Sequence, residues 1–311
     1  EITGLAPSNS INIAMSTNNK DDFLQHRKQQ EERHFAIGDP DDPIASILTV
    51  EVNTTELCNR TCVFCPRHDP KVYPNRNLHM TVKGAEAIKD QLRSIGYRGK
   101  VSLSGFGENL LNPNFKRIVS TFKQGLPKAV VECNTNGDRL TKEVVEDLFT
   151  RKLDYLYINL YDGPEQIEHF EPMLVNIDRD RVKYRAHYNE DDYGLFINNR
   201  SGTIDWLNID DGDITKLQGK RCHYPFYKMF VDWNGDVLFC SNDWGKEHVV
   251  GNLLQQDIRE VWFSKEMRKI RNRLAKGDRT HSPCDKCSVN GQLFGEKSFN
   301  LIQDYESSNN R

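Results

Sequence analysis

Apolar runs of strand length alternate with amphipathic runs of helix length from about residue 47 onward. Such an alternation is typical of a parallel sheet whose strands are joined by crossover helices. The pattern therefore predicts an α/β fold. The six predicted strands are Ile47–Val52, Val101–Leu103, Ala129–Cys133, Tyr155–Leu160, Val182–Tyr188 and Ile204–Ile209.

The helices predicted between these strands have recognisable ends. Thr81 is suited to cap a helix that stops at Gly96, and Thr141 a later one, because a threonine hydroxyl accepts from the N–H groups of a first turn. A third helix opens at Asn112-Pro113 and stops at Gly125. Their apolar residues recur on one face, as helices that cover a sheet require.

The pattern changes past about residue 215. Met229–Trp233 and Asp236–Cys240 are predicted as two strands joined by a type I′ turn at Asn234-Gly235. A smaller second module is therefore expected. The predicted units are a leader and N-terminal arm (1–45), a first domain (46–214), the small module (215–295) and a C-terminal tail (296–311).

The N-terminal residues are expected to lie outside the folded core. Glu1–Ala14 lacks the features of a secretory signal and precedes Met15, so we interpret it as a leader segment. The polar stretch Ser16–Arg33 is expected to be a mobile or surface arm, because it has few apolar residues to bury.

Composition and charge argue against two classes of protein. No apolar run approaches the roughly 18 residues that a membrane-spanning helix needs. With 42 Lys+Arg against 45 Asp+Glu, the net charge of −3 provides no general attraction to a nucleic-acid backbone. Neither a membrane protein nor a nucleic-acid-binding protein is expected.

The eight cysteines favour metal ligation over disulfides, since no secretory signal is present and a reducing cytoplasmic location is expected. Cys58, Cys62 and Cys65 follow the first predicted strand. Three thiolates would leave one iron of a four-iron cluster open to an external ligand. A zinc site with His68 or His79 as an added ligand is the alternative.

Four more cysteines lie in the small module. Four thiolates complete either a zinc site or a closed four-iron cluster, and the spacing alone does not decide between them. Cys133 is the one cysteine outside these two sets. It lies in an apolar run, where a free cysteine behaves as a small core residue. The four module cysteines are Cys222, Cys240, Cys284 and Cys287.

The CxxxCxxC spacing, with Phe64 before the third cysteine, resembles the signature of the radical S-adenosylmethionine (SAM) superfamily. The resemblance implies a partial (β/α)6 barrel of the TIM type. It also implies a [4Fe–4S] cluster whose open iron binds SAM, and reductive cleavage of SAM to a 5′-deoxyadenosyl radical that abstracts hydrogen from a substrate. In such enzymes the cofactor supplies the chemistry and the protein orients the substrate.

A second segment looks like a superfamily motif. Ser104–Glu108 is similar to the glycine-rich segment that approaches the SAM amino group, although Phe106 stands between its glycines. Glycines permit close approach of the backbone, and a carboxylate accepts from an ammonium group. The resemblance therefore implies that Gly105, Gly107 and Glu108 bind SAM.

Four more residues are expected near SAM from the same resemblance. Asn136 and Asn159 lie in Asn-Gly and Asp-Gly segments after the third and fourth strands, where a plain turn is the alternative. Arg185 or Arg200 is expected to pair with the SAM carboxylate or an anionic substrate group, and an ordinary surface arginine is the alternative.

The small module resembles Twitch, the short form of the SPASM extension of radical SAM enzymes. The resemblance rests on the Asn234-Gly235-Asp236 turn before Cys240, on Gly251-Asn252-Leu253 and on Val261-Trp262. It implies one auxiliary [4Fe–4S] cluster ligated by all four thiolates. The cysteine spacing is most similar to that of the 2-deoxy-scyllo-inosamine dehydrogenases of butirosin biosynthesis, which oxidise a cyclic secondary alcohol.

A closed auxiliary cluster favours oxidation, because it can accept an electron but cannot bind substrate without losing a ligand. We therefore expect an oxidoreductase that dehydrogenates a small carbohydrate or aminocyclitol-like metabolite. His187 and Tyr161 are the preferred catalytic residues, with Tyr188 and His223 as further candidate bases. The resemblance also implies a flavodoxin or ferredoxin as electron donor.

Three alternatives are left open. A radical SAM epimerase would have to return a hydrogen atom, and Cys133 is the spare thiol. A peptide, protein or RNA modifying enzyme of the SPASM and Twitch type is the second. A zinc-bearing binding module without enzymatic activity is the third.

Overall fold

The computed structural model describes residues 19–188, 198–207 and 216–309. Its strands form one sheet in the order β5-β4-β3-β2-β1-β6-β7-β8. The strands are Thr49–Val52 (β1), Lys100–Leu103 (β2), Val130–Thr135 (β3), Tyr155–Leu160 (β4), Val182–Ala186 (β5), Lys228–Val231 (β6), Asp236–Leu238 (β7) and Val249–Asn252 (β8).

In this order, each strand from β5 through β1 to β6 is parallel to its neighbour, which confirms the predicted α/β fold with a parallel sheet. One strand was assigned wrongly. Residues 204–207 of the predicted strand Ile204–Ile209 are irregular, and 208–209 lie outside the described residues. The place beside β1 is taken by β6, with Lys228 opposite Thr49. Three of the four β6 residues are buried, as a parallel sheet strand requires.

Strand β7 pairs antiparallel with both β6 and β8, so the small module extends the sheet of the first domain without a break. The hairpin exists, but its predicted type I′ turn is wrong. Gly235 has a φ of 86°, and no other described residue between Asp232 and Asp236 has a positive φ, whereas type I′ needs two. The Gly235 N–H donates to the Asp232 carbonyl at 2.9 Å.

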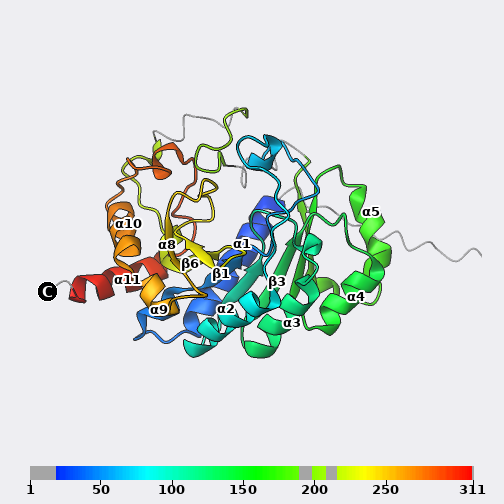
Figure 1. Ribbon diagram of the computed structural model, residues 1–311, viewed down its shortest axis with the longest axis horizontal. Coiled ribbons are helices and arrows are strands. Elements are labelled where there is room, and N and C mark those ends of the chain that lie inside the picture. Colours follow the sequence, from blue (N-terminus) through cyan, green and yellow to red (C-terminus); the bar gives the residue numbers. More distant parts are fainter. Residues whose placement is uncertain (1–18, 189–197, 208–215, 310–311) are drawn as a thin grey trace, which may run out of the picture.

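Helices cover the sheet as the sequence pattern predicted. Figure 1 shows α2, α3 and α4 in a row along one side of the parallel strands. Thr81 and Thr141 cap α2 and α4 with their hydroxyls. The helices are Asn19–Ala36 (α1), Val82–Ser94 (α2), Phe115–Gly125 (α3), Lys142–Thr150 (α4), Gln166–Phe170 (α5), Tyr224–Tyr227 (α8), Ile258–Trp262 (α9), Lys265–Ala275 (α10) and Glu296–Asn309 (α11).

The segment expected to be a mobile or surface arm is a helix, α1, where the structure describes it, and its inner side contacts the sheet. His34 is buried. The Lys100 ammonium donates to Gln30 Oε1 at 3.5 Å, and the Tyr157 hydroxyl and His26 Nε2 lie 3.3 Å apart. Polar side chains made this segment look solvated, but the inner face of the sheet is itself polar and binds them.

The expected polar tail is also a packed helix, α11. Phe299 and Ile302 are buried in a small apolar cluster. Glu306 is 4% exposed and lies 3.6 Å from Arg271, which is fully buried. Two buried side chains of opposite charge face each other here, so a segment that looked polar is part of the interior.

The apolar core lies between the sheet and its outer helices and continues into the small module. The described helices include none that is long and apolar enough to cross a bilayer. The opposite, inner face of the sheet carries polar side chains and borders the cavity that holds the candidate site.

Candidate active site

A cavity of about 1480 Å³ opens on the inner face of the parallel strands and is also lined by the small module. It gathers the three cysteines of the first cluster, the residues expected near SAM and the two preferred catalytic residues, whereas the further candidate base His223 does not line it. The residues gathered there are Cys58, Cys62, Phe64, Cys65, Gly105, Gly107, Glu108, Asn136, Asn159, Tyr161, Arg185, His187 and Arg200. Their convergence from five strand ends is what the parallel topology provides.

The cysteine loop follows β1 and is held by residues that sequence reasoning missed. Asn75 accepts from the Cys58 N–H at 3.0 Å and donates to the Cys58 carbonyl at 2.8 Å. Arg67 donates to Asn75 at 3.1 Å and to the Phe106 carbonyl. Nothing local in the sequence marks these two residues, because their partners come from distant segments.

Burial and the neighbouring thiols raise the pKa of Cys62 to about 12, and burial also raises the pKa values of Cys58 and Cys65. Without metal these thiols are therefore protonated at neutral pH. Cluster assembly must release their protons, as thiolate ligation requires.

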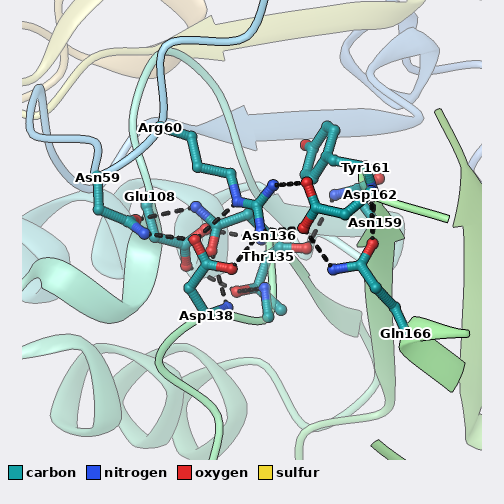
Figure 2. Close-up of polar contacts among 11 residues, drawn as sticks. Asn59, Arg60, Glu108, Thr135, Asn136, Asp138, Asn159, Tyr161, Asp162 and Gln166 are labelled. Carbon is teal, nitrogen blue, oxygen red and sulfur yellow. Dashed lines mark hydrogen bonds and ion pairs between the residues drawn. The ribbon is translucent and has the colours of Figure 1, made fainter. Parts of the chain in front are cut away.

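Arg60, inside the cysteine loop, clamps this loop to the ends of two other strands (Figure 2). Its Nε and Nη2 donate to Asp138 at 2.7 and 2.6 Å. Its Nη1 and Nη2 donate to Asp162 at 2.9 and 2.8 Å. Asn59 adds a bond to Asp138 at 2.6 Å and accepts one from Asn136 at 2.9 Å. The loop is thus tied to the segments after β3 and β4.

The glycine-rich segment lies against the loop after β1. A Cβ at Gly107 would come within 2.2 Å of the Thr55 carbonyl oxygen, and Gly105 has a φ of 137°. A residue with a side chain at either position would therefore force the backbone to move.

Glu108 is buried at the end of this segment. It accepts from the Thr135 hydroxyl at 2.7 Å and from the Asn136 and Leu110 N–H groups at 2.8 and 3.0 Å. Burial nevertheless raises its pKa. Because a carboxylate has about four acceptor positions, it retains capacity for one more donor such as an ammonium group.

Three rings pack together inside the cavity. Tyr161 stacks on Phe64 and on His187, with centroids 5.7 and 5.3 Å apart, and Phe64 and His187 are 5.5 Å apart. Arg60 lies 5.1 Å above the Tyr161 ring. Burial raises the Tyr161 pKa well above its usual value, so this residue remains a neutral phenol and cannot serve as a base at neutral pH.

His187 is held in one tautomer. Asn159 donates through Nδ2 to the Thr135 carbonyl at 2.9 Å, which leaves its Oδ1 facing His187 Nε2 at 3.1 Å. Nε2 therefore carries the proton. Nδ1 is a buried acceptor with no hydrogen-bond partner among the described residues. Burial, followed by Arg185 and Arg200, lowers the pKa of His187 to about 3, so the ring is neutral.

Arg200 stands on a strained turn that joins the two cysteine sets. Arg200 and Ser201 have φ values of 48° and 54°, which non-glycine residues seldom adopt. The neighbouring Asn199 exchanges hydrogen bonds with Ser288 at 2.9 and 3.1 Å, directly after Cys287. The side chain of Arg200 borders the first cavity, so this turn connects the small module to the site.

The four module cysteines line a second, small cavity of about 20 Å³. The N–H groups of Asn242 and Val289 point at Cys240 and Cys287 sulfurs at 3.4 Å each. A Cβ at Gly291 would lie 2.3 Å from the Cys222 sulfur, so this position has no room for a side chain. Sulfurs that face a common space and accept N–H bonds fit a thiolate-ligated cluster in number and chemistry.

Sequence reasoning missed Arg279, which holds this thiol pocket together by donating to three backbone carbonyls at 3.0 to 3.1 Å. Among the described residues, no group of three or more His, Cys, Asp and Glu side chains stands close enough to hold a single metal ion.

Comparison with known proteins identifies the two regions. The radical SAM superfamily matches residues 52–188, and the SPASM iron-sulfur cluster-binding domain matches residues 222–288. The chain therefore contains a radical SAM domain followed by a SPASM domain. As a radical SAM enzyme with a SPASM module, it uses SAM and [4Fe–4S] clusters, and the open set of three thiols and closed set of four fit these groups.

Relatives of this radical SAM enzyme have the same architecture. It is 27% identical to the S-adenosyl-L-methionine-dependent 2-deoxy-scyllo-inosamine dehydrogenase of Niallia circulans, over 84% of this chain and 99% of that protein. The crystal structure of BtrN in complex with AdoMet and 2-DOIA superposes with a TM-score of 0.69 and 26% identity, over 81% of this chain and 96% of BtrN.

A more distant structure, native anSMEcpe with bound AdoMet, matches in fold. It has a TM-score of 0.51 and 12% identity, over 84% of this chain and 97% of that one. The expected Twitch-bearing barrel fold is thus confirmed.

Proposed function

We propose that this radical SAM enzyme oxidises a secondary alcohol of a small hydroxylated metabolite, a carbohydrate or aminocyclitol-like ring, to a ketone. One observation carries this proposal. Tyr224, Asn242 and Val289 line both the main cavity and the small thiol pocket, so the two cavities share a wall. An electron released in the main cavity has a short path to the auxiliary site. The dehydrogenase named among the relatives supports the same reaction class.

When bound, SAM and its cluster supply hydrogen-atom abstraction, and the auxiliary cluster supplies an acceptor for the remaining electron. We assign the first cluster to the loop of Cys58 to Cys65 and the auxiliary cluster to the four module cysteines. We assign SAM to the wall formed by Phe64, the segment Gly105–Glu108, Asn136 and Asn159, with Arg200 available for its carboxylate.

His187 is proposed to receive the substrate hydroxyl. Its Nδ1 is an acceptor in the cavity wall, and Asn159 fixes the ring so that this lone pair is available. A neutral imidazole with a pKa of about 3 accepts a hydrogen bond but does not retain the proton at neutral pH. The proton therefore passes on to water, and His187 acts chiefly by orienting the hydroxyl.

The redox-neutral alternative is not favoured. An epimerase must return a hydrogen atom, and the spare thiol Cys133 is fully buried in the apolar core. It does not border the main cavity, and burial raises its pKa far above the usual value. Cys133 therefore serves packing.

The reductant and the location are proposals from the superfamily resemblance. A flavodoxin or ferredoxin of the cytoplasm would deliver the electron that starts each turnover.

The test is anaerobic turnover of the reconstituted enzyme with SAM, a reductant and 2-deoxy-scyllo-inosamine or related polyols. We expect 5′-deoxyadenosine and ketone in equal amounts. The Cys240→Ala variant should still cleave SAM but lose ketone formation, because the electron has no acceptor. Normal ketone formation by Cys240→Ala, or a product at the alcohol oxidation level, would contradict the proposal.

A further inference from the structure

The thiol pocket of the small module is lined by a buried cation. Arg279 borders the pocket together with the four module cysteines, and it is the one cation among the described residues that line it. Its side chain belongs to a residue that is 2% exposed, so water screens its charge only weakly. The alcohol oxidation proposed above assigns no task to this charge.

Hydrogen bonds fix the position of Arg279 but do not neutralise it. Its Nε and Nη2 donate to the Lys220 and Arg221 carbonyls at 3.0 Å each, directly before the first module cysteine. Its Nη1 donates to the Val289 carbonyl at 3.1 Å, just after the last module cysteine. All three acceptors are uncharged. A guanidinium has five N–H donors, so two of them remain available.

No carboxylate among the described residues pairs with Arg279. Asp278 precedes it in sequence, but its Oδ1 accepts from the Thr280 N–H and hydroxyl at 3.0 and 2.6 Å. The other oxygen of Asp278 lies 3.9 Å from Arg273. A buried charge without an opposite charge is unfavourable. The structure therefore indicates that a negative group in the thiol pocket completes this site.

The charge of Arg279 acts on two of the four thiols. Burial raises the pKa values of Cys222 and Cys284, with the neighbouring thiols adding to the effect at Cys284, whereas Arg279 opposes the rise at both. Lys228 acts on one further thiol, but this lysine already pairs with Glu51. Arg279 is therefore the described cation whose charge remains for the pocket.

A four-iron cluster held by four thiolates has the charge that this cation requires. Its net charge is about −2 when oxidised and about −3 after it takes up one electron, and net charge is one of the factors that set the potential of such clusters. An adjacent buried cation stabilises the more negative, reduced form to a greater extent. The reduction potential of the cluster therefore rises.

We propose that Arg279 is a positioning residue that raises the reduction potential of the auxiliary cluster through its buried charge. The inference deepens the proposed alcohol oxidation and rests on it where it concerns the ketone. In that reaction the substrate radical left after hydrogen abstraction gives one electron to the auxiliary cluster and its hydroxyl proton to water, which yields the ketone. A higher potential favours this electron transfer.

The test is a redox titration of the reconstituted holoenzyme, followed by electron paramagnetic resonance. SAM changes the signal of the first cluster and so distinguishes the two clusters. Arg279→Gln removes the charge and Arg279→Lys retains it, and neither reproduces the three carbonyl bonds. In Arg279→Gln the ratio of reduced to oxidised auxiliary cluster at a fixed potential should fall about ten-fold, which equals about 59 mV. Arg279→Lys should remain near the wild type.

Arg268→Gln is the matched control, because Arg268 is exposed on α10 and loses the same charge in water. It should leave the potential of the auxiliary cluster unchanged, and the first cluster should keep its potential in every variant. Melting temperature and iron content measure the structural part of the role. Both Arg279 variants should melt below the wild type, since both lose the bonds to the backbone.

Two results would overturn the inference: a wild-type potential in Arg279→Gln, or equal shifts in both Arg279 variants, as a merely structural role would produce. Loss of the auxiliary cluster from both variants, seen as about four missing iron atoms, would overturn it as well. Loss from Arg279→Gln alone would support it, because the charge then retains the cluster.

The titration needs no substrate, so it separates this inference from the proposed function. Ketone formation by the wild type together with an unchanged potential in Arg279→Gln would contradict the inference alone. A wild type that forms no ketone, with a potential that still depends on Arg279, would contradict the alcohol oxidation and support the role of Arg279.

Discussion

The Arg60 clamp leads to a quantitative prediction about SAM binding. Arg60→Gln removes the charged bonds to Asp138 and Asp162, which hold the cysteine loop over the segments after β3 and β4. The Arg60 side chain is 20% exposed, and those of Asp138 and Asp162 are 28% and 58% exposed. Water therefore screens both pairs, and each contributes about 0.2 to 1 kcal/mol.

The contact of Arg60 with the Tyr161 ring adds about 0.5 kcal/mol. The total is about 1 to 2.5 kcal/mol, which corresponds to a roughly 5- to 60-fold higher KM for SAM. The maximal rate should change less, because Arg60 holds the loop and does not touch the reacting atoms in our assignment. Arg60→Lys should recover part of the affinity, since it retains charge but lacks the bidentate geometry.

The assay is 5′-deoxyadenosine formation against SAM concentration, at low and high salt. Salt should raise the wild-type KM toward that of Arg60→Gln, because exposed ion pairs are screened. Arg93→Gln is the matched control, as Arg93 pairs with Asp90 on the surface of α2. The reasoning is refuted if Arg60→Gln leaves the KM for SAM unchanged. It is also refuted if the effects of Asp138→Asn and Arg60→Gln on that KM are fully additive in free energy, because substitutions of two residues that bind each other should have non-additive effects.

Three further predictions concern other parts of the chain. Gly291→Ala should lower bound iron from about eight to about four atoms per chain, because its Cβ would lie 2.3 Å from the Cys222 sulfur; an unchanged iron content refutes this. Cys133→Ala should lower the unfolding free energy by about 1 kcal/mol yet preserve ketone formation, and loss of product in a folded variant would restore the epimerase reading. Burial lowers the pKa of His34 to about 4. Between pH 6.5 and 4 the unfolded chain therefore binds more protons at this residue than the folded chain does. As pH falls through this window, the free energy of unfolding should decrease by up to about 3 kcal/mol. His34→Phe should flatten that dependence in chemical denaturation, and equal slopes would contradict it.

Local sequence patterns predicted most of the parallel sheet. Thr81 and Thr141 cap their helices as expected, because an N-cap depends on residues three or four positions apart. The segment of β6 was predicted as a hairpin strand, but Ile204–Ile209 was wrongly assigned as the sixth strand, because the pairing of β6 with β1 joins segments far apart in sequence. The segments α1 and α11 looked solvated, since their polar residues bind partners that the sequence does not reveal.

In the candidate site, too, some features could be predicted from local sequence and others depend on the tertiary structure. The spacing of Cys58, Cys62 and Cys65 was sufficient by itself to indicate a cluster loop, because its ligands lie within one short segment. The tautomer of His187 was not predictable, since it follows from Asn159 on the neighbouring strand.

The sequence by itself determined the two sets of three and four metal-ligating thiols, because thiol number and spacing are local properties that metal ligation uses directly. The resemblance to the radical SAM signature then favoured iron–sulfur clusters over zinc. Only the tertiary structure decided how the cluster loop is held and which distant segments line the cavity. Arg60 meets Asp138 across 78 residues of chain. Arg27 lines the cavity from a helix in the segment that was expected to be a mobile or surface arm. Such contacts follow from the packing of whole elements, and no local pattern records them.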